Sequence, residues 1–235
     1  MLKNKRATVA RLGKRMLAAG LTTGTGGNLS WCDRRRGLIA VSPSGVAYDR
    51  MTAADVAVVD LEGRRMDGDL APSSELPFHL ALYRHRPDVA AVVHTHSVYA
   101  TTLACLHWEI PAVHYLVGFA GPKVPLAAYA TYGTEALARN VVDAIGSSNA
   151  VLLANHGMIA VGADLEKAFA VAEEIELVAR IYYQAKAVGT PQILPEDEMQ
   201  RVMARFRSYG KKPLEERPQT AQNSLKIRAR GCPGA

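Results

Sequence analysis

The strongest constraint on the fold comes from a short apolar run in the middle of the chain, AAVVHTHSVYA at residues 90–100. Two histidines, His94 and His96, interrupt this run with one residue between them. Successive residues of a β-strand point to opposite faces, so a strand would place both imidazoles on one face, roughly 6.5–7 Å apart. A helix would separate them by about 200°. The run therefore predicts a buried strand that ends in two imidazoles.

Strand-like and helix-like segments alternate along the chain. Bounded apolar runs predict strands at 38–42, 56–60 and 89–97, and a strand–turn–strand unit at 150–162. Periodicity and capping signals predict helices at 4–19, from about 73 to Pro87, between Thr134 and Gly146, and between Asp164 and Gly189. Together these segments predict a mixed α/β protein.

The start of the second helix has several features of a helix N-terminus. Ser73 or Ser74 is expected to cap it, Glu75 suits the positively polarised end, and Pro77 is tolerated in a first turn. The first helix has a second interpretation, because the first 32 residues contain no acid and transit peptides share that feature. The spacing of its apolar side chains favours an amphipathic helix of the folded protein.

Charge and cysteine content exclude several classes of protein. The net charge is +6, but nine Lys and Arg residues against two acids lie from Arg201 onward, so the basicity belongs to the C-terminal end. We therefore expect no nucleic-acid partner, a basic and flexible tail at 211–235, and a single domain at 1–210. No apolar run approaches the roughly 20 residues of a membrane span. Three scattered cysteines predict a reducing compartment and a cytoplasmic protein.

A third histidine strengthens the case for a metal site. His156 follows an apolar strand and precedes Gly157 in a tight turn, so it also lies at a strand end. Glu75 lies upstream of the two-histidine strand and offers a carboxylate. Three histidines and one exchangeable ligand are the composition of a catalytic zinc site, although strand-end histidines can also simply form hydrogen bonds. The other histidines are interpreted as structural or solvent-facing: His79, His85, His107 and His114.

Three turns rich in small residues predict an anion site. They read GTGGNLS at 24–30, SPSG at 42–45 and PSSE at 72–75. Backbone N–H groups in such turns and at helix N-termini bind phosphates. Each turn alone is more often only a turn, but Ser73 and Ser74 adjoin Glu75 and so connect an anion site to the predicted metal site.

Taken together and in order, these residues resemble the class II aldolase/adducin family, and within it the L-fuculose-1-phosphate aldolase group. The resemblance runs from about residue 4 to Tyr209. It includes GTGGNLS, VSPSGV, PSSELPFHLALYRHRPDVAAVVHTH, IPAVHYLVGFAG, AAYATYGTEAL, NHGMIAVGADLEKA and RFRSYG.

The resemblance implies a three-layer α/β fold, in which helices flank a central, antiparallel-rich sheet. It implies a zinc enzyme, with one Zn²⁺ per subunit, that reversibly cleaves a ketose 1-phosphate to dihydroxyacetone phosphate and an aldehyde. His94, His96 and His156 would bind the zinc, and Glu75 would be both the fourth ligand and the catalytic acid/base. Manganese, cobalt or iron would also suit these ligands.

The resemblance also implies the substrate contacts and the assembly. Tyr115 would reach into a neighbouring subunit's site as a proton donor within a homotetramer, and Tyr209 would help close the site. Tyr132, Leu116 and Phe119 predict an apolar aldehyde end, as for a 5-deoxypentulose or methylthioribulose 1-phosphate. The phosphate would be held by Asn28, Ser44, Gly45, Ser73 and Ser74.

Other members of the family leave alternatives open. Pentulose-phosphate 4-epimerases carry Asp where this chain has Glu75, which favours an aldolase. Dehydratases of methylthioribulose phosphate and decarboxylases of sugar-acid phosphates share the fold. Adducin-type scaffolds share it as well but lack the metal ligands, all of which this chain has. Asn155 stands where the aldolase group often has a further histidine, and we expect no loss of function from that difference.

Overall fold

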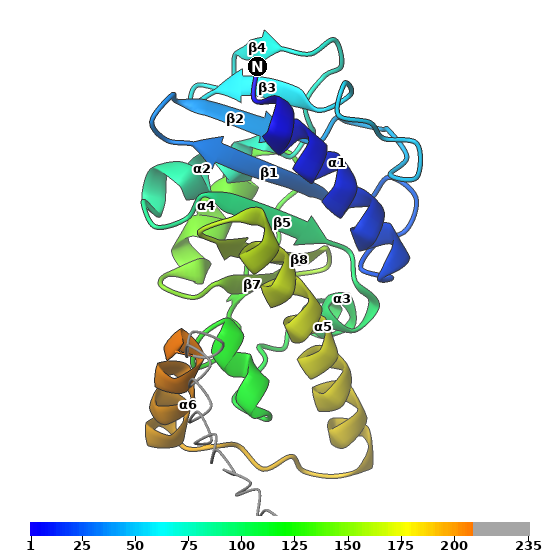
Figure 1. The fold of residues 1–235 in the computed structure, drawn as a ribbon. Coiled ribbons are helices and arrows are strands. Elements are labelled where there is room, and N and C mark those ends of the chain that lie inside the picture. The colour runs from blue at the N-terminus through cyan, green and yellow to red at the C-terminus, as the bar shows by residue number, and fades with distance from the viewer. Residues whose placement is uncertain (209–235) are drawn as a thin grey trace, which may run out of the picture.

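An eight-stranded sheet forms the middle of the molecule in the computed structural model, which describes residues 1–208 (Figure 1). The strands are β1 (Asn28–Asp33), β2 (Leu38–Val41), β3 (Ala57–Asp60), β4 (Arg65–Asp67), β5 (Ala91–Thr95), β6 (Leu126–Ala127), β7 (Ala150–Leu153) and β8 (Gly157–Gly162). The helices are α1 (Lys3–Ala18), α2 (Leu76–His85), α3 (Val98–Cys105), α4 (Glu135–Ile145), α5 (Leu165–Val188) and α6 (Glu196–Ser208), with a 3-10 helix η1 (Tyr115–Phe119).

The two-histidine strand occupies the interior of this sheet. The strand order is β4-β3-β2-β1-β5-β8-β7-β6, and every neighbouring pair is antiparallel except β6 with β7. Strand β5 therefore has a hydrogen-bonded neighbour on each side, and His94 lies opposite Asn28 of β1 and Ile159 of β8. The predicted antiparallel-rich sheet is confirmed.

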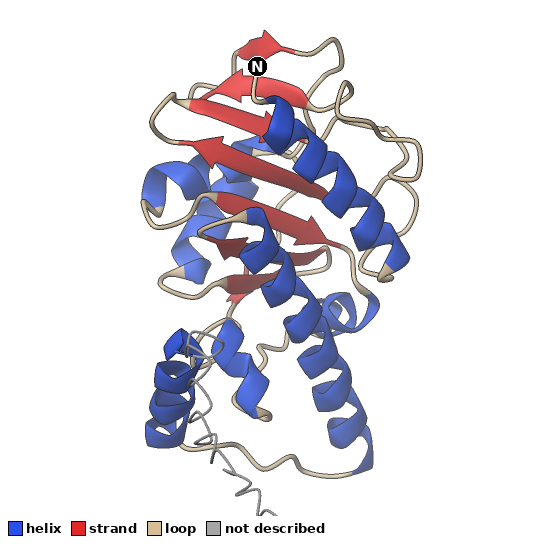
Figure 2. Ribbon diagram, in the orientation of Figure 1, coloured by secondary structure: helices blue, strands red, loops and turns tan. Residues whose placement is uncertain are grey.

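Helices cover both faces of the sheet, so the predicted three layers are also confirmed (Figure 2). One apolar core lies between the sheet and helices α1, α3 and α5, and it includes Leu12, Leu103 and Phe169. The other lies between the sheet and helices α2 and α4, and it includes Phe78 and Val141. Alternate residues of β5 enter the two cores because side chains of a strand point to opposite faces. His94 thereby faces the α2 and α4 layer.

Two predicted helix caps are confirmed and one is wrong. Thr134 accepts a hydrogen bond from the Leu137 N–H, and Asp164 accepts one from the Lys167 N–H. The second helix instead begins at Leu76, with Glu75 as its N-cap residue. The Ser73 hydroxyl oxygen accepts from the N–H of Glu75. Ser73 lies two residues before the N-cap, so this bond does not cap the helix.

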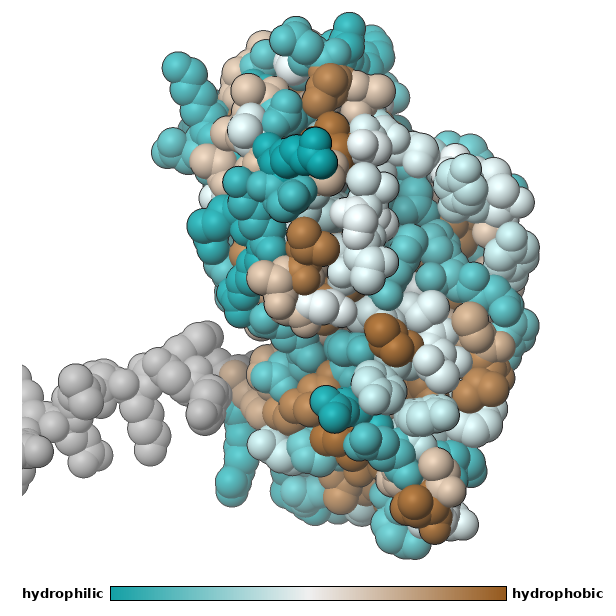
Figure 3. Space-filling model, turned by 90° about the vertical axis from the view of Figure 1, so that its right-hand side faces the viewer, coloured by the Kyte–Doolittle hydropathy of each residue, from teal (hydrophilic) through white to brown (hydrophobic). Residues whose placement is uncertain are grey.

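The sequence patterns did not indicate several elements: β1, β4, α3, η1, β6 and α6. Helix α6 packs against η1, and both lie below the sheet in Figure 1. Figure 3 views the molecule from the side of α3 and the end of α5, and it shows hydrophobic residues exposed in the lower half. No helix within residues 1–208 is both long and apolar enough to cross a bilayer. Tyr209 and the predicted tail at 211–235 lie outside the described residues.

Candidate active site

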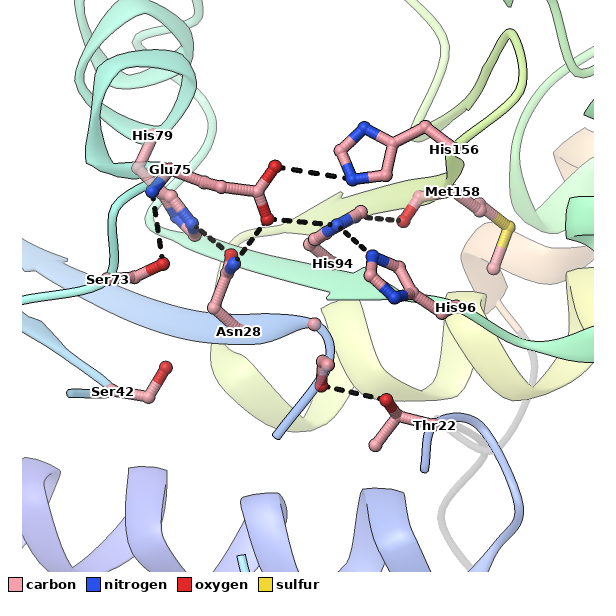
Figure 4. A network of polar contacts seen from close by, with 12 residues as sticks. Thr22, Asn28, Ser42, Ser73, Glu75, His79, His94, His96, His156 and Met158 are labelled. Carbon is pink, nitrogen blue, oxygen red and sulfur yellow. Dashed lines mark hydrogen bonds and ion pairs between the residues drawn. The ribbon is translucent and has the colours of Figure 1, made fainter. Parts of the chain in front are cut away.

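His94 and His96 project from the end of β5 into one cluster, as the strand spacing predicts (Figure 4). Their Nε2 atoms are 3.0 Å apart. The Nδ1–H of the fully buried His94 donates to the carbonyl oxygen of Met158 on β8, at 3.0 Å. In the neutral imidazole that bond leaves the lone pair on Nε2, which faces the cluster.

His156 reaches the same cluster from the turn between β7 and β8. Asn155 occupies the left-handed region with φ of 53°, which asparagine tolerates better than most residues, and the turn closes through a bond from His156 N–H to Leu153. A Cβ at Gly157 would lie 2.4 Å from the carbonyl oxygen of Thr95. Only glycine therefore lets β8 approach β5 closely enough to bring His156 beside His94.

Glu75 brings a carboxylate to the imidazoles from the N-terminus of α2. Its Oε2 lies 3.2 Å from Nε2 of His94 and accepts a 2.9 Å hydrogen bond from the Asn28 amide. Its Oε1 lies 3.3 Å from Nε2 of His156. That oxygen is buried, and no hydrogen bond from residues 1–208 reaches it. A buried carboxylate oxygen without a hydrogen bond is available as a ligand for a metal ion.

The protonation states suit metal binding. Burial raises the pKa of the Glu75 carboxyl, but the imidazoles of His94 and His156 and the Asn28 amide outweigh burial and lower the pKa to about 2. Burial, reinforced by neighbouring imidazoles, lowers the pKa of both His96 and His156 to about 4. At neutral pH the carboxylate is therefore ionised and these two imidazoles are neutral, which is the form in which each binds a metal.

The spacing of these donor atoms suits a small tetrahedral cation. One donor atom from each of Glu75, His94, His96 and His156 lies within 4.8 Å of all the others. Donor atoms about 2.0–2.1 Å from a tetrahedral zinc would lie roughly 3.3 Å apart. The separations of 3.0, 3.2 and 3.3 Å between cluster atoms are close to that value. The four residues that were predicted as ligands therefore fit a metal of the zinc type.

A cavity of about 350 Å³ adjoins the cluster. Its wall includes every residue predicted for the phosphate, together with Tyr132: Asn28, Ser44, Gly45, Ser73 and Ser74. The turns that carry these serines pair through a bridge between Pro43 and Pro72. The backbone N–H groups of Ser44 and Ser73 are occupied in that pairing, by Ala71 and Ser42. An anion here would therefore meet mainly hydroxyl groups and the remaining N–H groups of the turns.

Some of the aromatic residues line the cavity, and others lie away from it. Tyr132, which was predicted at the site, lines the cavity and is 65% exposed. Tyr129, which was not predicted, also lines it and is 61% exposed. Tyr115 is half exposed at the start of η1 and packs near Phe206, away from the cavity of its own chain. Phe119 also packs on Phe206, and neither it nor Leu116 lines the cavity of its own chain. An apolar pocket that includes these two residues stays a prediction. The cavity wall near the cluster includes Tyr129, Ala130 and Tyr132.

The fold and this site define a class II aldolase-type protein, and comparison with known proteins gives the same family. Residues 7–183 match the family described as class II aldolase and adducin N-terminal domain. That match covers most of the chain, which belongs to this family.

Two curated relatives are similar over most of their length. The 5-deoxy-D-ribulose 1-phosphate aldolase of Bacillus thuringiensis serovar kurstaki is 50% identical over 89% of this chain and 99% of its own. The 5-methylthioribulose-1-phosphate/5-deoxyribulose-1-phosphate aldolase of Rhodospirillum rubrum is 42% identical over 84% and 88%. A solved L-fuculose 1-phosphate aldolase superposes with a TM-score of 0.86 at 42% identity, over 88% of this chain and 98% of that one.

Proposed function

We propose that the protein is a metal-dependent aldolase that reversibly cleaves a ketose 1-phosphate to dihydroxyacetone phosphate and an aldehyde. The observation that carries the proposal is the convergence of three imidazoles and a carboxylate beside a cavity lined by hydroxyl-bearing turns. The relatives named as aldolases support it. His94, His96, His156 and Glu75 would hold the metal, for which zinc is the first candidate.

The chemistry has one demanding step. The bond between C3 and C4 breaks, the hydroxyl at C4 loses its proton to become the aldehyde, and the electron pair stays on the dihydroxyacetone phosphate fragment. A bound divalent metal supplies Lewis-acid stabilisation of the negative charge that forms in this step. Glu75 lines the cavity, so its carboxylate is placed to carry the proton that the enediolate carbon takes up.

The phosphate group anchors the substrate. Hydroxyl groups of Ser44, Ser73 and Ser74, with the Asn28 amide and Gly45, would hold it at the wall of the cavity. Binding energy from this group, which does not react, orients the carbons that do.

The group that exchanges a proton with the C4 oxygen is proposed to come from another subunit. It accepts the proton during cleavage and donates it to the aldehyde oxygen in the condensation direction. Tyr115 is exposed and does not line the cavity of its own chain, which fits a phenol that completes a neighbour's site. We propose a homotetramer, supported by large apolar side chains that are exposed on α3, at its C-cap and on α5: Val98, Leu106, Leu177, Tyr183 and Val188. A cytoplasmic location stays a prediction.

The aldehyde is proposed to be small and apolar. Tyr129, Ala130 and Tyr132 line the cavity near the metal cluster and offer little hydrogen bonding besides two phenols. The two relatives above are named for 5-deoxyribulose and methylthioribulose 1-phosphates, and both support this substrate class.

The test is a coupled assay for release of dihydroxyacetone phosphate from protein of known metal content. The substrates are fuculose, 5-deoxyribulose and methylthioribulose 1-phosphates, and Glu75→Gln is the matched variant. We expect release that Glu75→Gln abolishes, with a higher kcat/KM for the two deoxy-type substrates. Preference for fuculose 1-phosphate would contradict the apolar aldehyde. Zinc-loaded protein that releases nothing would contradict the aldolase and favour an epimerase, a dehydratase or a decarboxylase.

A further inference from the structure

A line of buried polar side chains leads away from Glu75 on the side opposite the imidazoles. We call it the polar chain, and it consists of Asn28, His79, Ser30 and Tyr83. Asn28 and Ser30 come from β1, and His79 and Tyr83 from α2. None of the four is more than 3% exposed. The first part of it is visible in Figure 4, where dashed lines join the Glu75 carboxylate to Asn28 and Asn28 to the His79 ring.

Each neighbouring pair in the polar chain is within hydrogen-bond distance. Asn28 Nδ2 is 2.9 Å from Glu75 Oε2, and Asn28 Oδ1 is 2.6 Å from His79 Nε2. His79 Nδ1 is 2.7 Å from Ser30 Oγ, which is 2.6 Å from the Tyr83 hydroxyl. The polar chain thus joins the predicted catalytic carboxylate to a phenol in the core.

The donor and the acceptor of each hydrogen bond in the polar chain can be assigned by starting at Glu75. An ionised carboxylate only accepts, so Asn28 must present its NH₂ group to Glu75 and its carbonyl oxygen to His79. His79 must then donate from Nε2. Burial lowers the pKa of His79 to about 3, so this imidazole is neutral and its Nδ1 accepts. Ser30 therefore donates to Nδ1, and Tyr83 donates to Ser30.

We propose that His79 is a positioning residue for the reaction, because its Nε2–H locks the Asn28 amide with the NH₂ group toward Glu75 and the cavity. The two faces of an amide are nearly equal in shape, so packing alone does not select one. A flipped amide would set its oxygen against the carboxylate and its NH₂ group against the Nε2–H of His79. The first contact is repulsive for any ionised carboxylate, and the second is repulsive while the His79 proton is on Nε2.

The orientation of the Asn28 amide affects both the Glu75 carboxylate and the cavity. Asn28 touches Glu75 and also lines the cavity. A fixed amide holds the carboxylate where it meets the imidazoles, and it offers the second N–H of Asn28 to the cavity. The inference therefore rests on the proposed function of this site, but it concerns a residue that the sequence analysis interpreted as structural or solvent-facing.

Three variants separate positioning from packing. His79→Phe keeps a ring beside Phe78, whose ring is 4.6 Å away, but removes the donor. His79→Gln retains an N–H that can reach Asn28. Tyr83→Phe is the matched control, because it removes a hydrogen bond at equal depth while Ser30 still donates to Nδ1. We expect His79→Phe to lower kcat and zinc affinity by about 10–100-fold, as for other outer partners of metal ligands. His79→Gln should restore both to within about threefold, and Tyr83→Phe should lower only the Tm.

A measurement on the unmodified protein does not depend on any variant folding. Nitrogen-15 spectra of the metal-free protein report which ring nitrogen of His79 carries the proton, and the His79→Gln spectrum assigns the signal. We expect the proton on Nε2. A proton on Nδ1, or equal losses of zinc affinity in His79→Phe and Tyr83→Phe, would overturn the inference. Zinc affinity and the ring spectrum still decide it if the unmodified protein releases no dihydroxyacetone phosphate, a result that contradicts only the proposed function.

Discussion

The imidazole of His94 is tied by its Nδ1–H to the carbonyl oxygen of Met158, 3.0 Å away on the neighbouring strand. A ring that is bonded at one nitrogen is held with the other nitrogen pointing at His96 and Glu75. The bond to Met158 thus fixes the ring in the orientation that a metal ligand needs, with one nitrogen directed at the cluster.

The two nitrogens of His94 can be separated by substitution. The Nδ2 of an asparagine can take the place of Nδ1, so His94→Asn should keep the bond to Met158 and lose the nitrogen that faces the cluster. We expect a Tm close to that of the unmodified protein and loss of bound metal, measured by elemental analysis. His94→Ala should lose both metal and stability. His85→Asn, at an exposed position of α2, is the control and should retain full metal content.

The metal-free protein should lose stability as the pH falls below about 6.5. His96 and His156 have pKa values near 4 in the folded protein, so the unfolded chain binds more protons between pH 6.5 and 4. Stability from these groups is therefore complete above that window and decreases as the pH falls through it. We expect a loss of about 1–3 kcal/mol from the more buried His156 and a smaller loss from His96, which is exposed and screened by solvent.

Thermal melts of metal-free protein across this range provide the measurement. The slope of Tm against pH should flatten in His96→Gln, because one of the two histidines no longer titrates. The lowered pKa of Glu75 acts in the same direction but only below about pH 4.5. A Tm that rises as the pH is lowered from 6.5 to 4 would contradict the assignment of neutral imidazoles.

Ser74→Ala should weaken substrate binding without releasing the metal. Its hydroxyl lines the cavity next to Glu75, and a hydrogen bond to a charged group is worth about 1.5–3 kcal/mol. We expect KM to rise roughly 10–100-fold and inorganic phosphate to become a weaker competitive inhibitor. Metal content should be unchanged. An unchanged KM with a reduced kcat would place the phosphate elsewhere.

Gly157→Ala should damage the fold and the site together. The added Cβ would lie 2.4 Å from the Thr95 carbonyl oxygen, so β8 must move away from β5. We expect a loss of about 1–3 kcal/mol in the free energy of unfolding and weaker metal binding through His156. Gly189→Ala is the matched control, because its Cβ would meet nothing within 4 Å. Chemical denaturation and metal titration of both variants make the comparison, and equal behaviour would contradict the close-approach argument.

The site was more predictable than its surroundings for a physical reason. Histidines in apolar strands stand out against their neighbours, so strand geometry could put His94, His96 and His156 at strand ends. The family resemblance then predicted them as one ligand set. His79 could not be placed in this way, because a histidine on a helix contacts whatever the opposite strand brings to it. That partner, Asn28, lies on β1, and the glycines before Asn28 made the segment look like a turn.

Helix caps and aromatic contacts could likewise be predicted only where they depend on residues nearby in the sequence. Thr134 and Asp164 could be predicted as caps because a cap depends only on the next three residues. The start of α2 was misplaced because Glu75 is also held by Asn28, which is 47 residues away in the chain. Phe119 was expected in the cavity, but its position depends on α6, a helix that sequence patterns did not indicate.

The place of β5 in the sheet has a consequence for how the molecule opens. Two of the three cluster imidazoles extend from β5 and the third from the turn into β8, and both strands have partners on either side. The short outer strands β4 and β6 can separate from the sheet in partial unfolding without breaking the β5–β8 ladder. Amide exchange should therefore be slowest along β5 and β8. The three histidines of the cluster would then belong to the last part of the protein to unfold, so partly opened molecules would keep most of their metal ligands.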